Sequence, residues 1–323
     1  MQKNTDNYFP LAKLKNLNSF ERKVLEGLVF CGISEKTVSK STPLGIAVSG
    51  GADSVSLLLS LNAIFGNENI CVITIDHGIR SEEESGGDAA FVEQLCKNYK
   101  ISCEILKIPY GEISKKSAET KKSIEETARV FRYNFFESFI RQKNLCNLAL
   151  AHNQNDQTET LLMRFLQGSS TEGMGGIERV RGKFIRPLLD ISRDEIEVYL
   201  TEKNQKWRTD ATNFDIKYFR NKIRNVLVPF LNENFTGWHK PVLMAAKKTK
   251  DDEDFIKNCC PVNRYDSTVN RDFFYSLHDS LKRRVFFSAL NKAGFGGRFP
   301  FKLFEEVLQW QNKKTNKISY ENL

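Results

Sequence analysis

The chain has 323 residues and a mass of 37.1 kDa, and its content of 40% hydrophobic and 27% charged residues is that of a globular protein with room for one large domain and a smaller one. The net charge of +8 is concentrated in residues 241–323 and permits a polyanionic partner without requiring one. There is no apolar run of about 18 residues, which excludes a transmembrane helix, and no N-terminal signal core, which predicts a cytoplasmic protein. The seven cysteines lack the CxxC spacing of a zinc ribbon or a Cys-ligated cluster.

An anion-binding turn is predicted early in the chain. Residues 1–43 are expected to form a partly helical leader, a strand follows at Leu44–Val48, and an apolar helix then continues to about Phe65. The turn between strand and helix consists of Ser49, Gly50, Gly51, Ala52, Asp53 and Ser54. Its glycines let backbone N–H groups approach a ligand and its serines lie beside a helix N-terminus, so we expect it to bind phosphate. It contains no Walker A lysine, and a turn that only permits tight packing is the simpler alternative.

A second strand, Ile70–Ile75, is predicted to end at the same edge of the sheet. It is followed directly by the polar residues Asp76, His77 and Arg80. Ligands of open parallel α/β sheets bind at the carboxyl ends of the strands, so these side chains are expected to border a ligand. A polar segment then leads into a helix at Ala89–Lys100.

The alternation of strand and helix continues with a third strand at Cys103–Ile108. The charged stretch Gly111–Ser123 has no apolar period and is predicted to be a mobile loop. The following helix, Ile124–Lys143, is expected to turn phenylalanines inward and to carry Arg129 and Arg132 beside them.

A fourth strand, Leu145–Ala151, ends on His152. If the next helix begins near Asn155, Asp156 and Glu159 lie three residues apart on one face of its first turn. Two carboxylates there could hold a cation such as an ammonium group or Mg²⁺. The alternative is an acidic first turn that only complements the helix dipole.

The remaining segments complete the predicted fold. A further strand is expected at Phe184–Leu189, and a later amphipathic helix carries Arg220, Lys222 and Arg224. Such a basic face suits a phosphate-rich ligand, although a solvated face is the more common explanation. Strands that alternate with helices predict an α/β fold with a doubly wound parallel sheet, and the segment from residue 238 onward is expected to form a small, mainly helical domain.

The SGGADS turn matches the SGGxDS signature of the PP-loop ATP pyrophosphatases, which cleave ATP between its α and β phosphates to adenylate a substrate. Beyond this turn the chain resembles the tRNA(Ile)-lysidine synthase family, with RPLL at 186–189 and five blocks in order: AVSGGADS at 47–54, DHGIR at 76–80, ARVFRY at 128–133, LAHNQNDQTETLLMRFLQGS at 150–169 and DATNFDIKYFRNKIRNVLVPFL at 210–231. The resemblance covers residues 44–231. With the leader expected at 1–43, it implies a catalytic domain at 44–237 and an accessory, tRNA-binding domain at 238–323.

The resemblance also implies an activity. The enzyme would use ATP and Mg²⁺ to adenylate C2 of the wobble cytidine in the CAU anticodon of tRNA(Ile), and the ε-amine of free L-lysine would then displace AMP to leave lysidine. The carbonyl oxygen leaves poorly until it is adenylated, so positioning and charge neutralisation are the expected work of the enzyme. The sequence specifies no oligomeric state.

The resemblance assigns expected roles to residues of the matched blocks. ATP would be bound by Ser49, Gly50, Gly51, Ala52, Asp53, Ser54, Asp76, His77 and Arg80, with Asp53 as the metal contact. Lysine would be bound by Asp156, Glu159 and His152, and tRNA by Arg220, Lys222 and Arg224. The expected catalytic residues are Asp53, Asp156, Arg129 and Arg132. Many members of the family have an aspartate where this chain has Asn155, so a metal or proton role at that position is in question.

Three alternatives remain open at this point. A PP-loop tRNA thiolase would share the fold and the adenylation, but it needs a cysteine persulfide or a cluster. A PP-loop amidotransferase or synthetase for a small metabolite would leave the block at 210–231 without a role, and no glutaminase-like region is present. A catalytically silent RNA-binding protein would be expected to have a damaged turn, whereas SGGADS is intact.

Overall fold

The computed structural model describes residues 8–9, 15–76, 82–121, 123–209, 219–259, 271–294 and 301–309. The chain divides into two compact units, Met1–Ala246 and Lys247–Leu323. No helix of these described ranges is both long enough and apolar enough to cross a membrane.

The first unit is built on a six-stranded sheet with the order β3-β2-β1-β4-β6-β5. Neighbouring strands pair in parallel except for the edge strand β5, which pairs antiparallel with β6. The bounds are β1 Leu44–Ala47, β2 Ile70–Asp76, β3 Ser102–Lys107, β4 Leu148–Ala149, β5 Val180–Arg181 and β6 Phe184–Ile185. The predicted doubly wound parallel sheet is therefore confirmed, and the short antiparallel strand is an addition to it.

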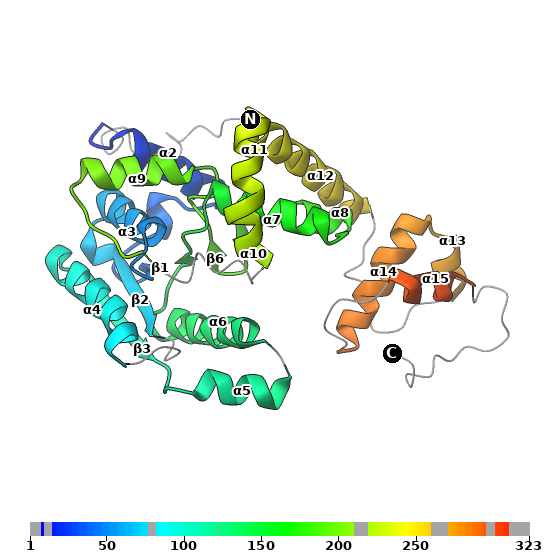
Figure 1. Ribbon diagram of the computed structural model, residues 1–323, viewed down its shortest axis with the longest axis horizontal. Helices are drawn as coiled ribbons and strands as arrows, with labels where there is room; N and C mark the ends of the chain where they lie inside the picture. The colour runs from blue at the N-terminus through cyan, green and yellow to red at the C-terminus, as the bar shows by residue number, and fades with distance from the viewer. Residues whose placement is uncertain are drawn as a thin grey trace. The chain divides into compact units, whose positions relative to one another are not determined.

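Helices cover both faces of this sheet (Figure 1). One core holds the β1 residues Leu44 and Ile46 together with apolar side chains of α2, α3, α4 and α9. The opposite core holds the β2 residues Cys71 and Ile73 with side chains of α6. The helices are α2 Ser19–Phe30, α3 Ala52–Phe65, α4 Glu82–Tyr99, α6 Ile124–Gln142 and α9 Arg193–Glu202. Within β2, Ile70 and Val72 belong to the first core and Cys71 and Ile73 to the second, so successive residues point to opposite layers, as the pleat requires.

The segment expected to be a leader contributes to the first core. Its helix α2 buries Val24, Leu25 and Leu28 in the same cluster as the β1 residues. The helix begins with a reciprocal capping box in which Asn18 Oδ1 accepts the Glu21 N–H and Glu21 accepts the Asn18 N–H.

The predicted mobile loop at Gly111–Ser123 is wrong, because a helix, α5 (Glu112–Thr120), occupies most of it. Only Ile113 of this helix is buried, and it packs with Ile108 and Ala128. One apolar anchor against α6 is therefore enough to hold a helix that shows no apolar period in the sequence.

Helix α4 begins at Glu82, seven residues before the predicted start at Ala89.

Besides α9, four helices and a π-helical turn lie in the described residues between β4 and residue 239. Helix α7 (Gln154–Leu166) and the single turn α8 (Thr171–Met174) follow β4. Helix α10 (Phe219–Lys222) continues through a π-helical turn, Ile223–Leu227, into α11 (Val228–Asn234).

The second unit is helical in its described residues, as predicted. It contains the end of α12 (His239–Cys259), α13 (Arg271–Ser276), α14 (Asp279–Lys292) and α15 (Phe301–Gln309). Its core consists of Phe274, Val285, Phe304 and Val307. A buried ion pair joins Glu253 of α12 to Arg284 of α14.

Candidate active site

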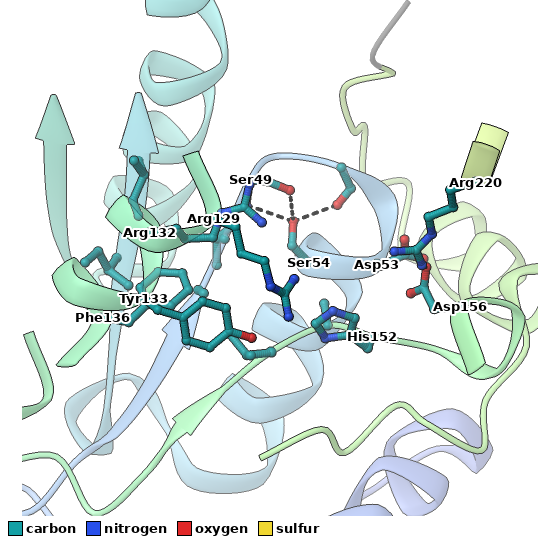
Figure 2. A pocket seen from close by; sticks show the side chains of 17 residues that line it. Ser49, Asp53, Ser54, Arg129, Arg132, Tyr133, Phe136, His152, Asp156 and Arg220 are labelled. Carbon is teal, nitrogen blue, oxygen red and sulfur yellow. Dashed lines mark hydrogen bonds and ion pairs between the residues drawn. The ribbon is translucent and has the colours of Figure 1, made fainter. Parts of the chain in front are cut away.

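A cavity of about 410 Å³ opens at the carboxyl ends of the central strands. The turn after β1, the helix α6 and the segment from β4 into α7 line it, and Figure 2 shows their side chains converging. Its polar lining consists of Ser49, Asp53, Ser54, Arg129, Arg132, Tyr133, His152, Asp156 and Arg220. The position is the one at which open α/β sheets bind ligands.

The turn after β1 is a preformed anion cradle. Gly50 has a φ of +87°, a conformation that side chains with a Cβ rarely adopt, and Gly51 is the N-cap of α3. Ser54 Oγ accepts the Ser49 N–H at 3.1 Å and donates to the Gly51 carbonyl at 2.9 Å (Figure 2). This network fixes the turn against the positive end of the helix dipole, where phosphate groups are stabilised.

Asp53, in the first turn of α3, is held from two sides. Its Oδ1 accepts a hydrogen bond from Asn153 Nδ2 at 2.9 Å, and its Oδ2 forms an ion pair with Arg193 Nη1 at 2.8 Å. Burial raises the pKa of Asp53 above its ordinary value, while the charge of Arg193 opposes that rise.

Asp53 fits a magnesium ion that arrives with a nucleotide. A carboxylate has about four lone-pair directions, so two hydrogen bonds leave room for a metal. Within the described ranges no group of three or more His, Cys, Asp and Glu side chains could hold a metal ion by itself. Mg²⁺ commonly takes one or two carboxylates and completes its shell with phosphates and water, which is what Asp53 at the cradle would allow.

One wall of the cavity is cationic. Arg129, Arg132 and Tyr133 share a face of α6, and the Arg129 guanidinium lies 5.0 Å from the centre of the Tyr133 ring. Burial, followed by the charge of Arg129, lowers the pKa of Arg132. Such a wall favours an anionic ligand, which would relieve the repulsion between the two arginines.

His152 lies between this wall and α7 (Figure 2). Burial and the surrounding arginines lower its pKa to about 3, so the imidazole is neutral at physiological pH. Its Nδ1 is buried without a hydrogen-bond partner among the residues that the structure describes. A buried polar atom of this kind is normally satisfied by a ligand or water, which makes Nδ1 a candidate contact for a substrate.

The two predicted carboxylates of α7 lie on one face and are both paired with arginines. Arg220 Nη2 lies 2.7 Å from Asp156 Oδ1, and Arg220 Nε lies 3.1 Å from Glu159 Oε2. Arg224 donates to Glu159 Oε1 at 2.6 Å and to Oε2 at 2.8 Å. The Glu159 side chain is only 5% exposed, so this cluster is more than an acidic first turn at a helix dipole.

Asp156 also caps the start of α7, where it lies in the first turn of the helix. Its backbone N–H donates to Asn153 Oδ1 at 3.0 Å, and its Oδ2 accepts the Asn153 N–H at 3.1 Å. This capping box leaves Oδ1 directed toward the arginines. The helix begins at Gln154, one residue before the predicted start, and the Asn-x-x-Asp spacing at 153–156 could have located it.

The structure brings most of the predicted site residues together. Four turn residues, Ser49, Gly51, Asp53 and Ser54, border one cavity together with Arg129, Arg132, His152, Asp156 and Arg220. Gly50 and Ala52 do not line it, and Glu159 and Arg224 adjoin it through their ion pairs. Asp76, the last residue of β2, and the exposed Lys222 do not line the cavity, and His77 and Arg80 lie outside the described residues.

Tyr133, Asn153 and Arg193 belong to the site but were not predicted as site residues. Asn153 and Arg193 both contact Asp53, but the sequence shows them only as a helix cap and as a charged residue after a helix cap. Asn155, the amide at the questioned position, accepts a hydrogen bond from the Arg193 N–H at 3.0 Å. It therefore supports the start of α9.

The chain matches the PP-loop domain family over residues 19–231 and belongs to that family. A tRNA(Ile)-lysidine synthase of Treponema denticola is 37% identical over 92% of this chain and 66% of its own length. The protein of that name from Borreliella burgdorferi strain B31 is 36% identical over 84% of this chain and 63% of its own length. These relatives confirm the resemblance that the motif blocks indicated. The chain spans less than two thirds of the length of these curated relatives.

The fold also has a solved neighbour. The U34-tRNA thiolase NcsA of Methanococcus maripaludis, determined with its [4Fe-4S] cluster, has a TM-score of 0.54 and 18% identity, covering 74% of this chain and 80% of the thiolase. At this identity the likeness supports the PP-loop fold and says nothing about the substrate.

Proposed function

We propose that the protein is an ATP-dependent ligase that forms lysidine at the wobble cytidine of tRNA(Ile) with a CAU anticodon. The observation that carries the proposal is that a phosphate cradle and the carboxylate of Asp156 border one cavity, with Glu159 joined to Asp156 through Arg220. Relatives with the name tRNA(Ile)-lysidine synthase support it. A cytoplasmic location, free L-lysine and ATP as substrates, and Mg²⁺ as the cofactor belong to the same proposal.

The adenylation step would use the cradle and the cationic wall. Ser49, Gly51 and Ser54 would hold the phosphates at the N-terminus of α3, with Arg129 and Arg132 available to neutralise the charge that develops on them. Bound Mg²⁺ at Asp53 would add Lewis-acid stabilisation of the leaving pyrophosphate. The cavity would align the cytidine carbonyl with the α-phosphate, so that positioning supplies much of the rate.

The transfer step would use the carboxylates of α7. Asp156 and Glu159 are proposed to bind the ammonium groups of lysine. A cation that enters must displace the guanidinium groups of Arg220 and Arg224 or share the two carboxylates with them. These arginines, with Lys222, are the proposed contacts of tRNA phosphates. The neutral His152 can accept a hydrogen bond at Nδ1, but its low pKa makes it a poor general base.

The thiolase alternative is less well supported by the cavity. None of the described cysteines lines it, and Cys31, Cys71 and Cys96 are buried elsewhere. A persulfide on these side chains could not reach an adenylated base in the cavity. The carboxylate pair, in contrast, suits an amine as the nucleophile.

The test is an assay of pyrophosphate release and amino-acid incorporation. The full chain is incubated with ATP, Mg²⁺, labelled lysine and tRNA(Ile) with a CAU anticodon, and tRNA(Met) with the same anticodon is the control. Lysine incorporated only into tRNA(Ile) is the expected result. Pyrophosphate release without incorporated lysine would retain the adenylation and reject lysine as the nucleophile.

A further inference from the structure

Arg193 is a charged residue of the site that neither the motif blocks nor the predicted roles include. It is the first residue of α9, directly after the N-cap Ser192, whose capping box with Glu195 fixes the helix start. The backbone N–H of Arg193 donates to Asn155 Oδ1 at 3.0 Å. The start of α9 is thereby joined to the first turn of α7, beside the cavity.

The side chain of Arg193 is oriented by two carboxylates. Its Nε donates to Glu197 Oε1 at 2.7 Å, one turn along the same helix, and its Nη1 donates to Asp53 Oδ2 at 2.8 Å. The first contact fixes the plane of the guanidinium, and the second directs it at Asp53. The side chains of Arg193 and Asp53 are 35% and 29% exposed, so water screens this pair only in part.

Asp53 needs such a partner if the cradle binds a nucleotide. The carboxylate stands in the first turn of α3, beside the backbone groups that would face the phosphates, and it would repel an anionic ligand there. Asn153 supplies a hydrogen bond but no charge. The nearby Asp156 adds negative charge, and its own arginines are shared with Glu159.

We propose that Arg193 is a positioning residue that neutralises Asp53 and holds its carboxylate in place, so that the cradle accepts the phosphates of ATP before any metal ion is bound there. The inference rests on the proposed binding of ATP at this cavity. Arg193 acts through Asp53, and its contribution is greatest for the metal-free nucleotide, because a divalent cation at Asp53 takes over the neutralisation.

Binding of ATP to the full chain, measured by titration calorimetry once in EDTA and once in Mg²⁺, tests this role. Arg193→Gln is expected to weaken binding about tenfold in EDTA and clearly less in Mg²⁺, and Arg193→Lys is expected to restore most of the loss. In an Asp53→Asn background the same Arg193→Gln change is expected to weaken ATP binding less, since no carboxylate is left to neutralise. Lys23→Ala is the matched control, because it breaks an exposed ion pair with Glu195 on the same helix.

Three results would overturn the inference: unchanged binding by Arg193→Gln in EDTA, equal losses with and without Mg²⁺, or an undiminished loss in the Asp53→Asn background. Melting temperatures of the ligand-free variants separate a folding defect from a binding defect, and Arg193→Lys provides a charged variant should Arg193→Gln unfold. If the unchanged protein fails to bind ATP in either condition, the proposed function fails together with the inference.

Discussion

Asn155 makes a structural hydrogen bond that the aspartate of many relatives could also make, but it carries no charge. Its Oδ1 accepts the Arg193 N–H, and a carboxylate oxygen at the same position could accept the same hydrogen bond. The amide differs in that it adds no negative charge beside Asp53 and Asp156, which already lie close together. The cavity of this chain is therefore less acidic than one with an aspartate at position 155.

The carboxylates of α7 give the first prediction at the scale of single residues. Glu159→Gln is expected to retain tRNA-dependent pyrophosphate release and to lower lysine incorporation about 100-fold, because a charge-assisted contact to the ammonium group is lost. Asp156→Ala is expected to act in the same way, with an added loss of stability of about 1 kcal/mol from the capping box. Both rates are measured in the same reaction mixture.

Asp190→Asn is the control for these variants, since it removes an exposed carboxylate that pairs with Arg179 outside the cavity. Normal use of lysine by either α7 variant would show that the ammonium site lies elsewhere. A parallel loss of pyrophosphate release would instead place the carboxylates in the adenylation step.

His152 gives a prediction about pH. Because burial holds its pKa at about 3 in the folded protein, the unfolded chain takes up a proton below about pH 6.5 while the folded protein does not. Stability is therefore lost as the pH falls from 6.5 toward 3. At pH 5 this loss is about 2 kcal/mol for a group shifted in this way.

Urea unfolding at pH 7.5 and pH 5 measures this effect. Between pH 7.5 and pH 5 the free energy of unfolding is expected to fall by about 2 kcal/mol more in the unchanged protein than in His152→Asn. His278→Gln, a change at an exposed histidine of the second unit, should leave the difference as it is. Equal losses for the unchanged protein and His152→Asn would mean that the imidazole is charged or solvated in the folded state.

At the scale of elements, predictability followed the strength of local signals. The strand Leu44–Ala47, its glycine turn and the helix Ala52–Phe65 could be predicted, because the apolar runs and the φ requirement of Gly50 leave few alternatives. The helix Glu112–Thr120 could not be predicted, since Ile113 is its one buried side chain and its partners come from other elements.

The site divides in the same way. Its acidic and basic residues could be found from their place at strand ends and in the motif blocks. Their pairing could not, because the contacts of Arg220 and Arg224 with Glu159 join segments more than 60 residues apart. The π-helical turn that carries Arg224 has no sequence signature, although such turns are frequent at functional sites.

Helix α5 itself provides a test of its anchor. Ile113→Ala removes most of the apolar contact with Ile108 and Ala128, and we expect hydrogen exchange of the amides at 112–120 to become faster by about an order of magnitude or more. Lys115→Ala, at an exposed position of the same helix, should leave the exchange unchanged. Protection of the segment that survives in Ile113→Ala would show that other contacts hold the helix.

At the scale of the whole molecule, charge distribution determines how a polyanion is expected to bind. The net charge of +8 is concentrated in residues 241–323, whereas the carboxylates of the cavity are neutralised by arginines of the first unit. The first unit thus offers chemistry within a cavity, and the second unit offers exposed basic side chains such as Lys247 and Lys248 on α12. Under the proposed function, we expect binding of the body of the tRNA to depend on such exposed charges.

Substituting Lys247→Glu and Lys248→Glu together should therefore weaken tRNA binding and lower its dependence on salt. Each lost phosphate contact is expected to reduce the slope of log K against log salt by about 1, so the double variant should change it by about 1 to 2. Filter binding between 50 and 200 mM salt, values chosen because such slopes are steep there, provides the measurement. Lys36→Glu with Lys40→Glu applies the same change of net charge to exposed lysines of the first unit. If both pairs lower affinity equally, net charge alone accounts for binding; a loss confined to the α12 pair assigns the contact to the second unit.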